Sequence, residues 1–268
     1  MRVLLASLKA LLIALSALIV TVLQLSYFTL FFWSDNKKIW FFPSLFHKTA
    51  CKIVGIKVEF EGEDFGKIHK NKPLLYASNH TSYLDIVVIG SWVKGMFVAK
   101  SDIASWPIFG FLAKLQGTIF VERRPSAAKK QKEELENYVA KGSHLVIFPE
   151  GTTSLGTDVL PFKSSLFGAF MGENTDKDVY IQPISLTYTH MDGTPLDDER
   201  REIIAWYRED ESMIPHLWRF LRHGKMKAKL TFSDPIKIEN NADRKELAQI
   251  SWQAVQMTNA NSIKQSQS

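Results

Sequence analysis

The sequence predicts an α/β fold with a mostly parallel central sheet flanked by helices, behind an N-terminal helical segment that anchors the chain in a membrane. Two observations support this prediction. Short apolar runs alternate with helical patterns between residues 73 and 188, as in folds with buried parallel strands. Ahead of them, residues 10–33 contain no charged side chain, and this run exceeds the ~20 residues that cross a bilayer core.

We predict that residues 1–57 form the membrane anchor, a spanning or re-entrant helix followed by an interfacial segment. The uncharged run ends in the aromatic stretch "SYFTLFFW", which is typical of a headgroup interface. A second apolar stretch, "IWFFPSLF", contains Pro43 and is too short to span. A true span and a helix that returns from one leaflet both fit this pattern. Lysines after the run outnumber the basic residues before it, which favours a cytoplasmic globular part.

Residues 58–260 are long enough for one domain, and residues 261–268 are expected to be a frayed tail. Strands are expected at residues 73–78, 96–100, 117–123, 144–149, 179–188 and 225–232. Helices are expected at residues 83–93, 105–115, 126–140, 162–170 and 244–257. Pro107 falls in the first turn of its helix, where a proline is tolerated.

The chain carries a formal net charge of +5 and has a sequence pI of about 9.1. This surplus suits an anionic membrane surface or anionic substrates. Nucleic acid is not expected as a partner, because no zinc-ligand cluster and no basic block with interleaved aromatics occurs in the sequence. Cys51 is the only cysteine, so no intrachain disulfide forms, and no histidine has metal-ligand spacing. We predict no metal.

The stretch "SNHTSYLD" holds a histidine and an aspartate, His80 and Asp85, directly after the strand at residues 73–78. Ser82 and Asp85 fit a capping box at the start of the next helix. The same residues also fit a catalytic base with its orienting acid. The eight residues alone leave both interpretations open.

Two further polar segments follow strands. In open α/β sheets, sites gather at the carboxyl ends of parallel strands. "FVERR" ends in Arg123 and Arg124, which are able to clamp a phosphate, although a solvated strand end is an equal alternative. "FPEGTTS" begins a turn in which Glu150 could pair with one of these arginines. Its Gly151, Thr152 and Thr153 could present N–H and hydroxyl groups to an anion, and an ordinary glycine turn is the alternative.

Four ordered blocks resemble the glycerolipid acyltransferase family, which includes the 1-acyl-sn-glycerol-3-phosphate acyltransferases. The first is the His-x-x-x-x-Asp block at His80 and Asp85. The second, Gly-x-x-Phe-x-x-Arg, ends at Arg123, and the third, Phe-Pro-Glu-Gly-Thr-x-Ser, lies at residues 148–154. The fourth is the apolar strand "IQPISL" around Pro183. A histidine–aspartate pair alone is a weak signal, whereas four blocks in this order are a strong one.

The resemblance implies a membrane-bound O-acyltransferase that moves a fatty acyl chain from a thioester to the hydroxyl of a lysolipid. In it, His80 is the general base and Asp85 orients the imidazole, whose ordinary pKa of about 6.5 suits the task. By the same resemblance, Arg123 and the turn of Glu150, Gly151 and Thr152 bind the acceptor head group. No cofactor is implied. The partners are membrane lipids, a lysolipid acceptor, and acyl carrier protein or acyl-coenzyme A, and the location is a bacterial inner membrane.

Two departures bear on the acceptor. Relatives that act on lysophosphatidate commonly carry arginine where this chain has Thr153, and their "PFKKG" is "PFKSS" here. Fewer cations hold a phosphomonoester less firmly, although Arg124 and Lys163 could compensate. The leading acceptor is 1-acyl-sn-glycerol-3-phosphate. The alternative is lyso-ornithine lipid, whose acylating branch is similar at residues 160–170 and 205–221. A non-catalytic lipid-binding protein would require a broken motif, and an esterase would require a Gly-x-Ser-x-Gly elbow, which is missing from the sequence.

The segment "MIPHLWRFLRHGK" has apolar residues on one helical face, beside Arg219 and Arg222. A membrane-surface helix fits this pattern. A helix packed on the domain fits it as well, and we favour that interpretation.

Overall fold

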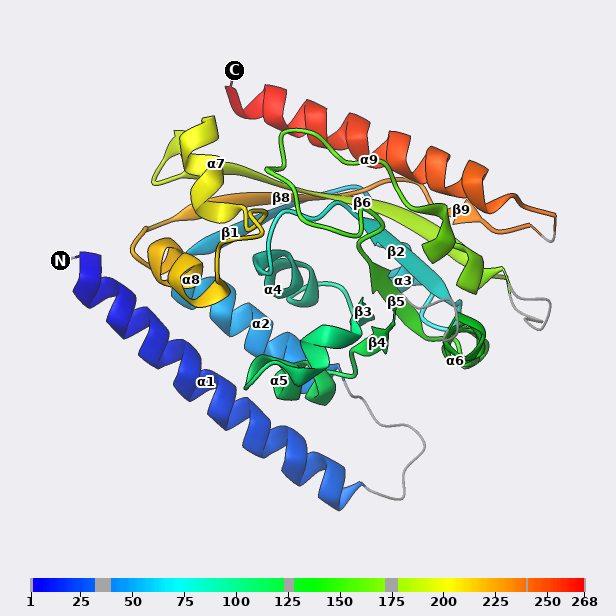
Figure 1. Ribbon diagram of the computed structural model, residues 1–268, viewed down its shortest axis with the longest axis horizontal. Helices are drawn as coiled ribbons and strands as arrows, with labels where there is room; N and C mark the ends of the chain where they lie inside the picture. Colours follow the sequence, from blue (N-terminus) through cyan, green and yellow to red (C-terminus); the bar gives the residue numbers. More distant parts are fainter. Residues whose placement is uncertain (1, 32–39, 123–127, 172–177, 240, 268) are drawn as a thin grey trace.

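The computed structural model describes residues 2–31, 40–122, 128–171, 178–239 and 241–267. In this part of the chain, strands form one sheet with the order β1-β8-β6-β2-β5-β3-β4, and β7 and β9 pair with β6 (Figure 1). The strands are β1 Ile56–Glu61, β2 Leu74–Ser78, β3 Met96–Lys100, β4 Ile119–Val121, β5 His144–Ile147, β6 Tyr180–Met191, β7 Thr194–Pro195, β8 Met226–Phe232 and β9 Ile236–Lys237.

The middle of the sheet is parallel. β2 pairs in parallel with β5 and β6, β3 with β4 and β5, and β1 with β8. The antiparallel pairs all involve β6, with β7, β8 and β9 as its partners. The predicted fold class, a mostly parallel sheet flanked by helices, is therefore confirmed.

Helices cover both faces of the sheet. They are α1 Arg2–Leu30, α2 Phe41–Val54, α3 Phe65–Ile68, α4 Leu84–Gly90, α5 Phe109–Leu115, α6 Ala128–Ala140, α7 Asp198–Ile204, α8 Met213–Leu221 and α9 Arg244–Gln267. In Figure 1, α9 runs along one side of the sheet and α2, α4 and α1 lie on the other. Because side chains alternate along a strand, β2 serves both cores: Leu74 and Tyr76 pack with α2 and α4, and Leu75 and Ala77 pack with α6 and α9.

Several predicted elements differ in extent. The helix expected at residues 105–115 begins only at Phe109, because Ile108 has a φ of 63° that no α-helix accommodates. The helix expected at 162–170 is two 3₁₀ turns, Ser164–Leu166 and Gly168–Phe170. β6 extends past residue 188 to Met191, where β8 continues the pairing.

The tail predicted to be frayed is helical instead, because α9 continues to Gln267. Ser262 is buried, and Gln265 accepts a hydrogen bond of 2.9 Å from Lys229 on β8. Earlier in α9, the buried Asn259 accepts a hydrogen bond of 2.7 Å from Thr187 on β6. These contacts with the sheet hold the final turns in place, and the sequence of the tail does not reveal them.

The N-terminal helix α1 lies along the domain rather than extending away from it. Ala6 is fully buried in the core that includes α2 and α4. Lys9 donates hydrogen bonds to Val54 O at the end of α2 (3.0 Å) and to His223 O after α8 (2.6 Å). Gln24 donates to Leu115 O at the end of α5 (3.5 Å). From Ala6 to Gln24, these contacts span about 27 Å of helix.

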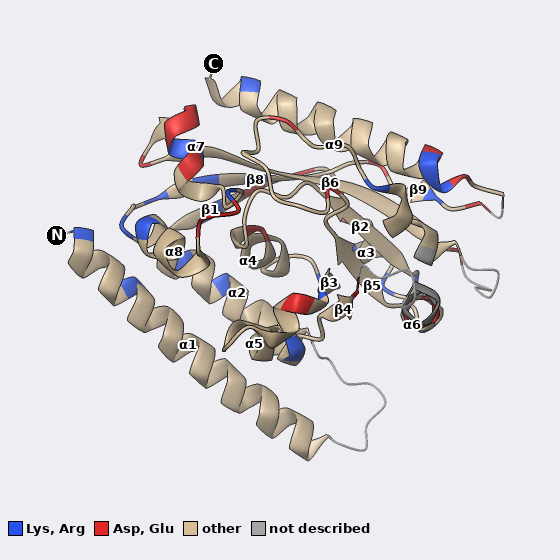
Figure 2. Cartoon of the chain, in the orientation of Figure 1, with Lys and Arg blue, Asp and Glu red and all other residues tan. Residues whose placement is uncertain are grey.

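The outer face of α1 is apolar and exposed. Along it lie Leu4, Leu8, Leu11, Leu15, Leu18, Ile19 and Val22, all more than 45% exposed. Figure 2 shows no charged residue on α1 beyond Arg2 and Lys9, near its N-terminal end. Judged by length and composition alone, α1 is long and apolar enough to cross a membrane.

The anchor predicted for residues 1–57 is not a separate unit. α2, expected to be interfacial, buries His47, Ala50, Cys51 and Val54 in the domain. The predicted boundary after residue 57 falls inside β1. The hydropathy pattern predicts the apolar helix α1, but it does not indicate the contacts of α1 with the domain.

Candidate active site

The histidine turn joins the end of β2 to the start of α4. Asn79 fixes it to β6, since its side chain donates to Leu186 O (2.9 Å) and accepts from Leu186 N (2.8 Å). This pair continues the link between β2 and β6 beyond Ser78 through a side chain. His80 therefore lies just beyond the sheet, at the carboxyl end of a central parallel strand.

His80 and Asp85 contact each other directly. His80 Nδ1 lies 2.8 Å from Asp85 Oδ2, and the side chains are 19% and 1% exposed, respectively. An ionised carboxylate only accepts, so Nδ1 carries the proton and Nε2 presents its lone pair. Among the described residues, Nε2 has no protein hydrogen-bond partner. The ring stacks on Phe148, with ring centroids 3.9 Å apart.

The buried carboxylate of Asp85 accepts from several donors. Oδ2 also accepts from Thr81 N (2.6 Å) and Ser82 N (2.9 Å), and Oδ1 accepts from the Tyr188 hydroxyl (3.0 Å). These donors compensate for the loss of water around the charge. Half of the predicted capping box forms: Asp85 Oδ2 accepts the N–H of Ser82, but Ser82 Oγ accepts from Leu84 N (3.3 Å) and the helix follows Tyr83 as its N-cap. The same Asp85 oxygen also orients His80.

Glu150, in the turn after β5, is 2% exposed and binds the backbone of the histidine turn. Its Oε1 accepts from His80 N (2.6 Å) and its Oε2 from Leu160 N (2.8 Å). Burial raises the pKa of this carboxyl to about 8. The expected partners Arg123 and Arg124 lie outside the described residues, so their pairing with Glu150 stays a prediction.

The glycine turn lies against His80. Ser154 N donates to His80 O (2.9 Å), and Gly151 adopts a φ of +71°. A Cβ added at Gly151 would lie 2.6 Å from Lys163 Nζ, so glycine here gives room to the ammonium group. Lys163 and Thr152 are exposed. The structure thus brings His80, Asp85, Glu150, Gly151 and Lys163 together.

Thr153 contacts the segment at residues 205–221, which lies outside the four blocks. Its hydroxyl donates to Trp206 O (2.5 Å), and Trp206 N donates to Thr81 O (3.0 Å). Trp206 therefore joins the histidine turn to the glycine turn. The Trp206 ring contacts Tyr83 and Trp106 edge-on, with centroids 5.8 and 6.0 Å apart. Trp206 thus packs beside the histidine turn.

Sequence reasoning missed three residues of this site: Asn79, Tyr188 and Trp206. Asn79 was visible in the quoted motif, but its partner Leu186 lies 107 positions away. Tyr188 ends the predicted strand that holds the fourth block, and nothing in its pattern indicates a carboxylate partner. In the described part of the chain, no group of three or more histidine, cysteine or acidic side chains is placed to hold a metal ion.

The arrangement is suited to accept a proton. A largely shielded imidazole with one free nitrogen and a buried carboxylate at its other nitrogen has the geometry that a general base needs toward a hydroxyl group within hydrogen-bond reach. No nucleophilic side chain is needed for attack on an already activated ester.

Comparisons with known proteins identify a family of acyltransferases. The family model described as "Acyltransferase" matches residues 57–187. A "Lyso-ornithine lipid O-acyltransferase" of Rhizobium meliloti (strain 1021) is 37% identical over 227 residues, which cover 83% of this chain and 76% of that protein. A "1-acyl-sn-glycerol-3-phosphate acyltransferase" of Neisseria gonorrhoeae is 28% identical over 163 residues, covering 59% and 58%.

The fold has a solved counterpart. The crystal structure of the 1-acyl-sn-glycerophosphate (LPA) acyltransferase PlsC from Thermotoga maritima superposes with a TM-score of 0.57 at 21% identity. The match covers 97% of each chain. At this identity it supports the fold alone.

Proposed function

Because the chain belongs to the glycerolipid acyltransferase family and is a lysolipid acyltransferase, we propose that it acylates the free hydroxyl of lyso-ornithine lipid with His80 as general base. The observation that carries the mechanism is the 2.8 Å contact between His80 Nδ1 and the buried Asp85 carboxylate. It leaves Nε2 as the proton acceptor at the carboxyl end of β2.

In the proposed step, the acceptor oxygen attacks the carbonyl carbon of an acyl thioester. Its proton passes to His80 Nε2, the new C–O bond forms, and the C–S bond breaks. The departing thiolate then receives the proton from the imidazolium, so the histidine returns to its neutral state. Asp85 stabilises the imidazolium while it carries the charge. The donor is acyl carrier protein or acyl-coenzyme A, both of which suit a chain of net charge +5.

The choice of acceptor rests on two observations. The sequence identity to the lyso-ornithine lipid enzyme is higher, and the aligned region is longer, than for the 1-acyl-sn-glycerol-3-phosphate enzyme. In addition, Thr153 bonds to Trp206 O, so this position of the glycine turn supplies a structural link and no cation. Lysophosphatidate is the second candidate, because Lys163 beside Gly151 offers one positive charge near the turn.

We further propose that α1 attaches the protein to one leaflet without crossing the bilayer. Its contacts with α2, α5 and α8 extend from Ala6 to Gln24. A crossing helix would carry these soluble elements into the hydrocarbon core with it. The apolar outer face of α1 then lies in the membrane, and the site faces the cytoplasmic side of a bacterial inner membrane.

The attachment has a direct test. In a Cys51→Ser background, Arg2→Cys and Thr29→Cys place thiols near the two ends of α1. An impermeant maleimide added to sealed inside-out vesicles is expected to label both positions. Labelling of one end from each side would show that α1 crosses the bilayer.

The function is tested by acceptor competition. Purified protein in mixed micelles receives one labelled acyl donor and equal amounts of lyso-ornithine lipid and lysophosphatidate. We expect acylated ornithine lipid as the main product. Phosphatidate as the main product would reverse the choice of acceptor, and product from neither would reject both.

A further inference from the structure

We infer that Tyr188 is a positioning residue for the reaction, which sets the orientation and the proton affinity of the His80–Asp85 pair through the second oxygen of the carboxylate. This inference rests on the proposed general-base role of His80. Tyr188 belongs to β6, far from the histidine turn in sequence, and no block of the family pattern includes it.

The contact that carries the inference is the hydrogen bond from the Tyr188 hydroxyl to Asp85 Oδ1, 3.0 Å long. Oδ2 accepts from the histidine turn itself, through Thr81 N, Ser82 N and His80 Nδ1. Tyr188 thus binds the opposite oxygen from a different element of the fold. It ties the carboxylate to the sheet rather than to its own turn.

The local backbone supports this placement. The β6–β8 pairing shifts register between Tyr188 and His190, as in a β-bulge. Bulges redirect side chains and are frequent beside active sites. Tyr188 is 3% exposed and packs in the core with Leu84 and Val88 of α4, the helix that carries Asp85.

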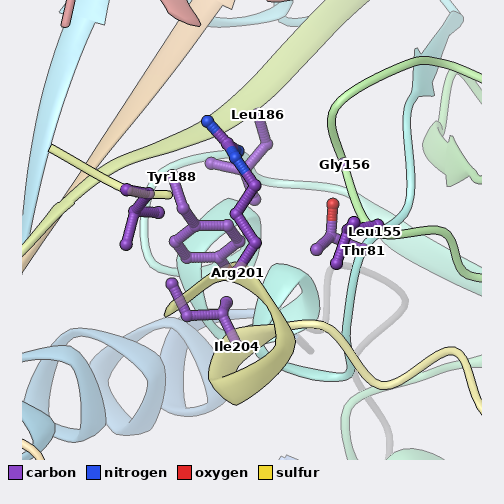
Figure 3. Close-up of a pocket in the computed structure, with 8 residues that line it drawn as sticks. Thr81, Leu155, Gly156, Leu186, Tyr188, Arg201 and Ile204 are labelled. Carbon is purple, nitrogen blue, oxygen red and sulfur yellow. The ribbon is translucent and has the colours of Figure 1, made fainter. Parts of the chain in front are cut away.

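A small pocket lies beside the tyrosine ring. It is open to solvent on one side and is lined by Thr81, Gly156, Leu186, Tyr188 and Arg201, among others. Figure 3 shows the Tyr188 ring beside the Arg201 side chain, with Thr81 and Gly156 across the pocket. Because Phe retains the ring, Tyr188→Phe removes the hydroxyl and keeps the ring's place in the core.

The chemistry follows from the charge on Asp85. A donor to Oδ1 draws negative charge away from the carboxylate and so weakens its hold on a protonated imidazole. Without the Tyr188 hydroxyl, the carboxylate attracts the imidazolium more strongly, and His80 loses its proton only at higher pH. Because the neutral ring is the active form, the acid limb of the pH–rate profile is expected to move to higher pH.

Other titratable groups lie around the pair, among them His216 of α8, which contacts the Tyr83 hydroxyl (2.8 Å) and whose pKa burial lowers. Cys51 of α2 has a pKa raised by burial to about 11, and burial also raises the pKa of Tyr83. Glu150, behind His80, has a pKa raised by burial to about 8. Arg201 of α7 remains a cation below pH 7, although burial lowers its pKa. These groups are the same in the wild type and in Tyr188→Phe, so the difference between their acid limbs reports on the His80–Asp85 pair.

The experiment compares Tyr188→Phe with wild type and with Tyr180→Phe, a control on the same strand whose hydroxyl instead accepts from Lys72 (3.3 Å). Acyl transfer to the lysolipid is measured from pH 5 to 7.5, with the melting temperature of each protein. We expect Tyr188→Phe to raise the half-maximal pH of the acid limb by about one unit. Tyr180→Phe is expected to leave the limb in place.

An unchanged acid limb in Tyr188→Phe would overturn the inference, whatever happens to the rate or the melting temperature, because a packing role alone leaves the limb in place. His80→Ala is measured beside it. If His80→Ala is inactive and the limb of Tyr188→Phe stays in place, only the role of Tyr188 fails. If His80→Ala retains its activity, the proposed general base fails as well.

Discussion

Replacement of Asp85 by asparagine is the sharpest perturbation of the site, because it removes the charge and retains the shape. In Asp85→Asn, the amide oxygen is able to occupy the position of Oδ2 and to accept from Thr81 N, Ser82 N and His80 Nδ1, which lie 2.6, 2.9 and 2.8 Å away in the wild type. The amide nitrogen then faces the Tyr188 hydroxyl, which accepts instead of donating. We therefore expect Asp85→Asn to fold.

Asp85→Asn is expected to lose activity because His80 becomes charged during the reaction. In the wild type, an imidazolium and a carboxylate form an ion pair whose aspartate is 1% exposed. With charge centres about 4 Å apart and an effective dielectric constant of about 20, their attraction is about 4 kcal/mol. Since each factor of ten in rate corresponds to about 1.4 kcal/mol, kcat is expected to fall about a thousandfold.

The assay is the initial rate of transfer from a labelled acyl donor to the lysolipid in mixed micelles, with the melting temperature measured on the same preparation. Asp102→Asn, at an exposed position, is the matched control and is expected to keep its activity. A loss of less than tenfold in Asp85→Asn, with the protein folded, would refute the electrostatic role of Asp85.

Other contacts in the fold and the site lead to three more predictions. Lys9→Met leaves Val54 O and His223 O without their ammonium donor, so we expect about 1–3 kcal/mol less stability and faster proteolysis at α1, measured against Lys48→Met on the surface of α2. Burial raises the pKa of Glu150 from 4.5, its value in the unfolded chain, to about 8 in the folded protein. Glu150 therefore stabilises the fold while it is protonated, and this contribution is lost as the pH rises from 4.5 to about 8. The melting temperature is expected to fall with rising pH over this range, and a slope in Glu150→Gln as steep as in the wild type would contradict this. Thr153→Val removes the bond to Trp206 O and is expected to lower kcat/KM about five- to tenfold, whereas Thr194→Val, at an exposed position on β7, is expected to leave kcat/KM unchanged; equal effects of the two would argue against the link.

Strand runs and ordered motifs were the most informative parts of the sequence. β2 and β5 are buried on both faces, so their apolar character is continuous and local, and both strands lie where they were predicted. The His80–Asp85 contact was predictable for a similar reason, since one short turn contains both residues.

Most features that the sequence did not predict depend on partners that are distant in sequence. Tyr188 reaches Asp85 across 103 positions, and Gln24 of α1 reaches Leu115 across 91. The hydropathy pattern predicts the length of α1, but it does not indicate which carbonyl groups Lys9 binds. The late start of α5 comes from the backbone of Ile108, which is an unusual conformation for a β-branched residue and has no signal in residue type.

The central claim is that His80 takes the proton from the lysolipid hydroxyl. The most direct measurement is a single-turnover experiment with His80→Ala, in which excess enzyme is mixed with labelled acyl donor and lyso-ornithine lipid, and the exposed His69→Ala is the matched control. The account predicts that His80→Ala binds to vesicles as the wild type does but forms no acylated lipid on the time scale on which His69→Ala completes its turnover. Acylated product from His80→Ala at the wild-type rate would contradict it.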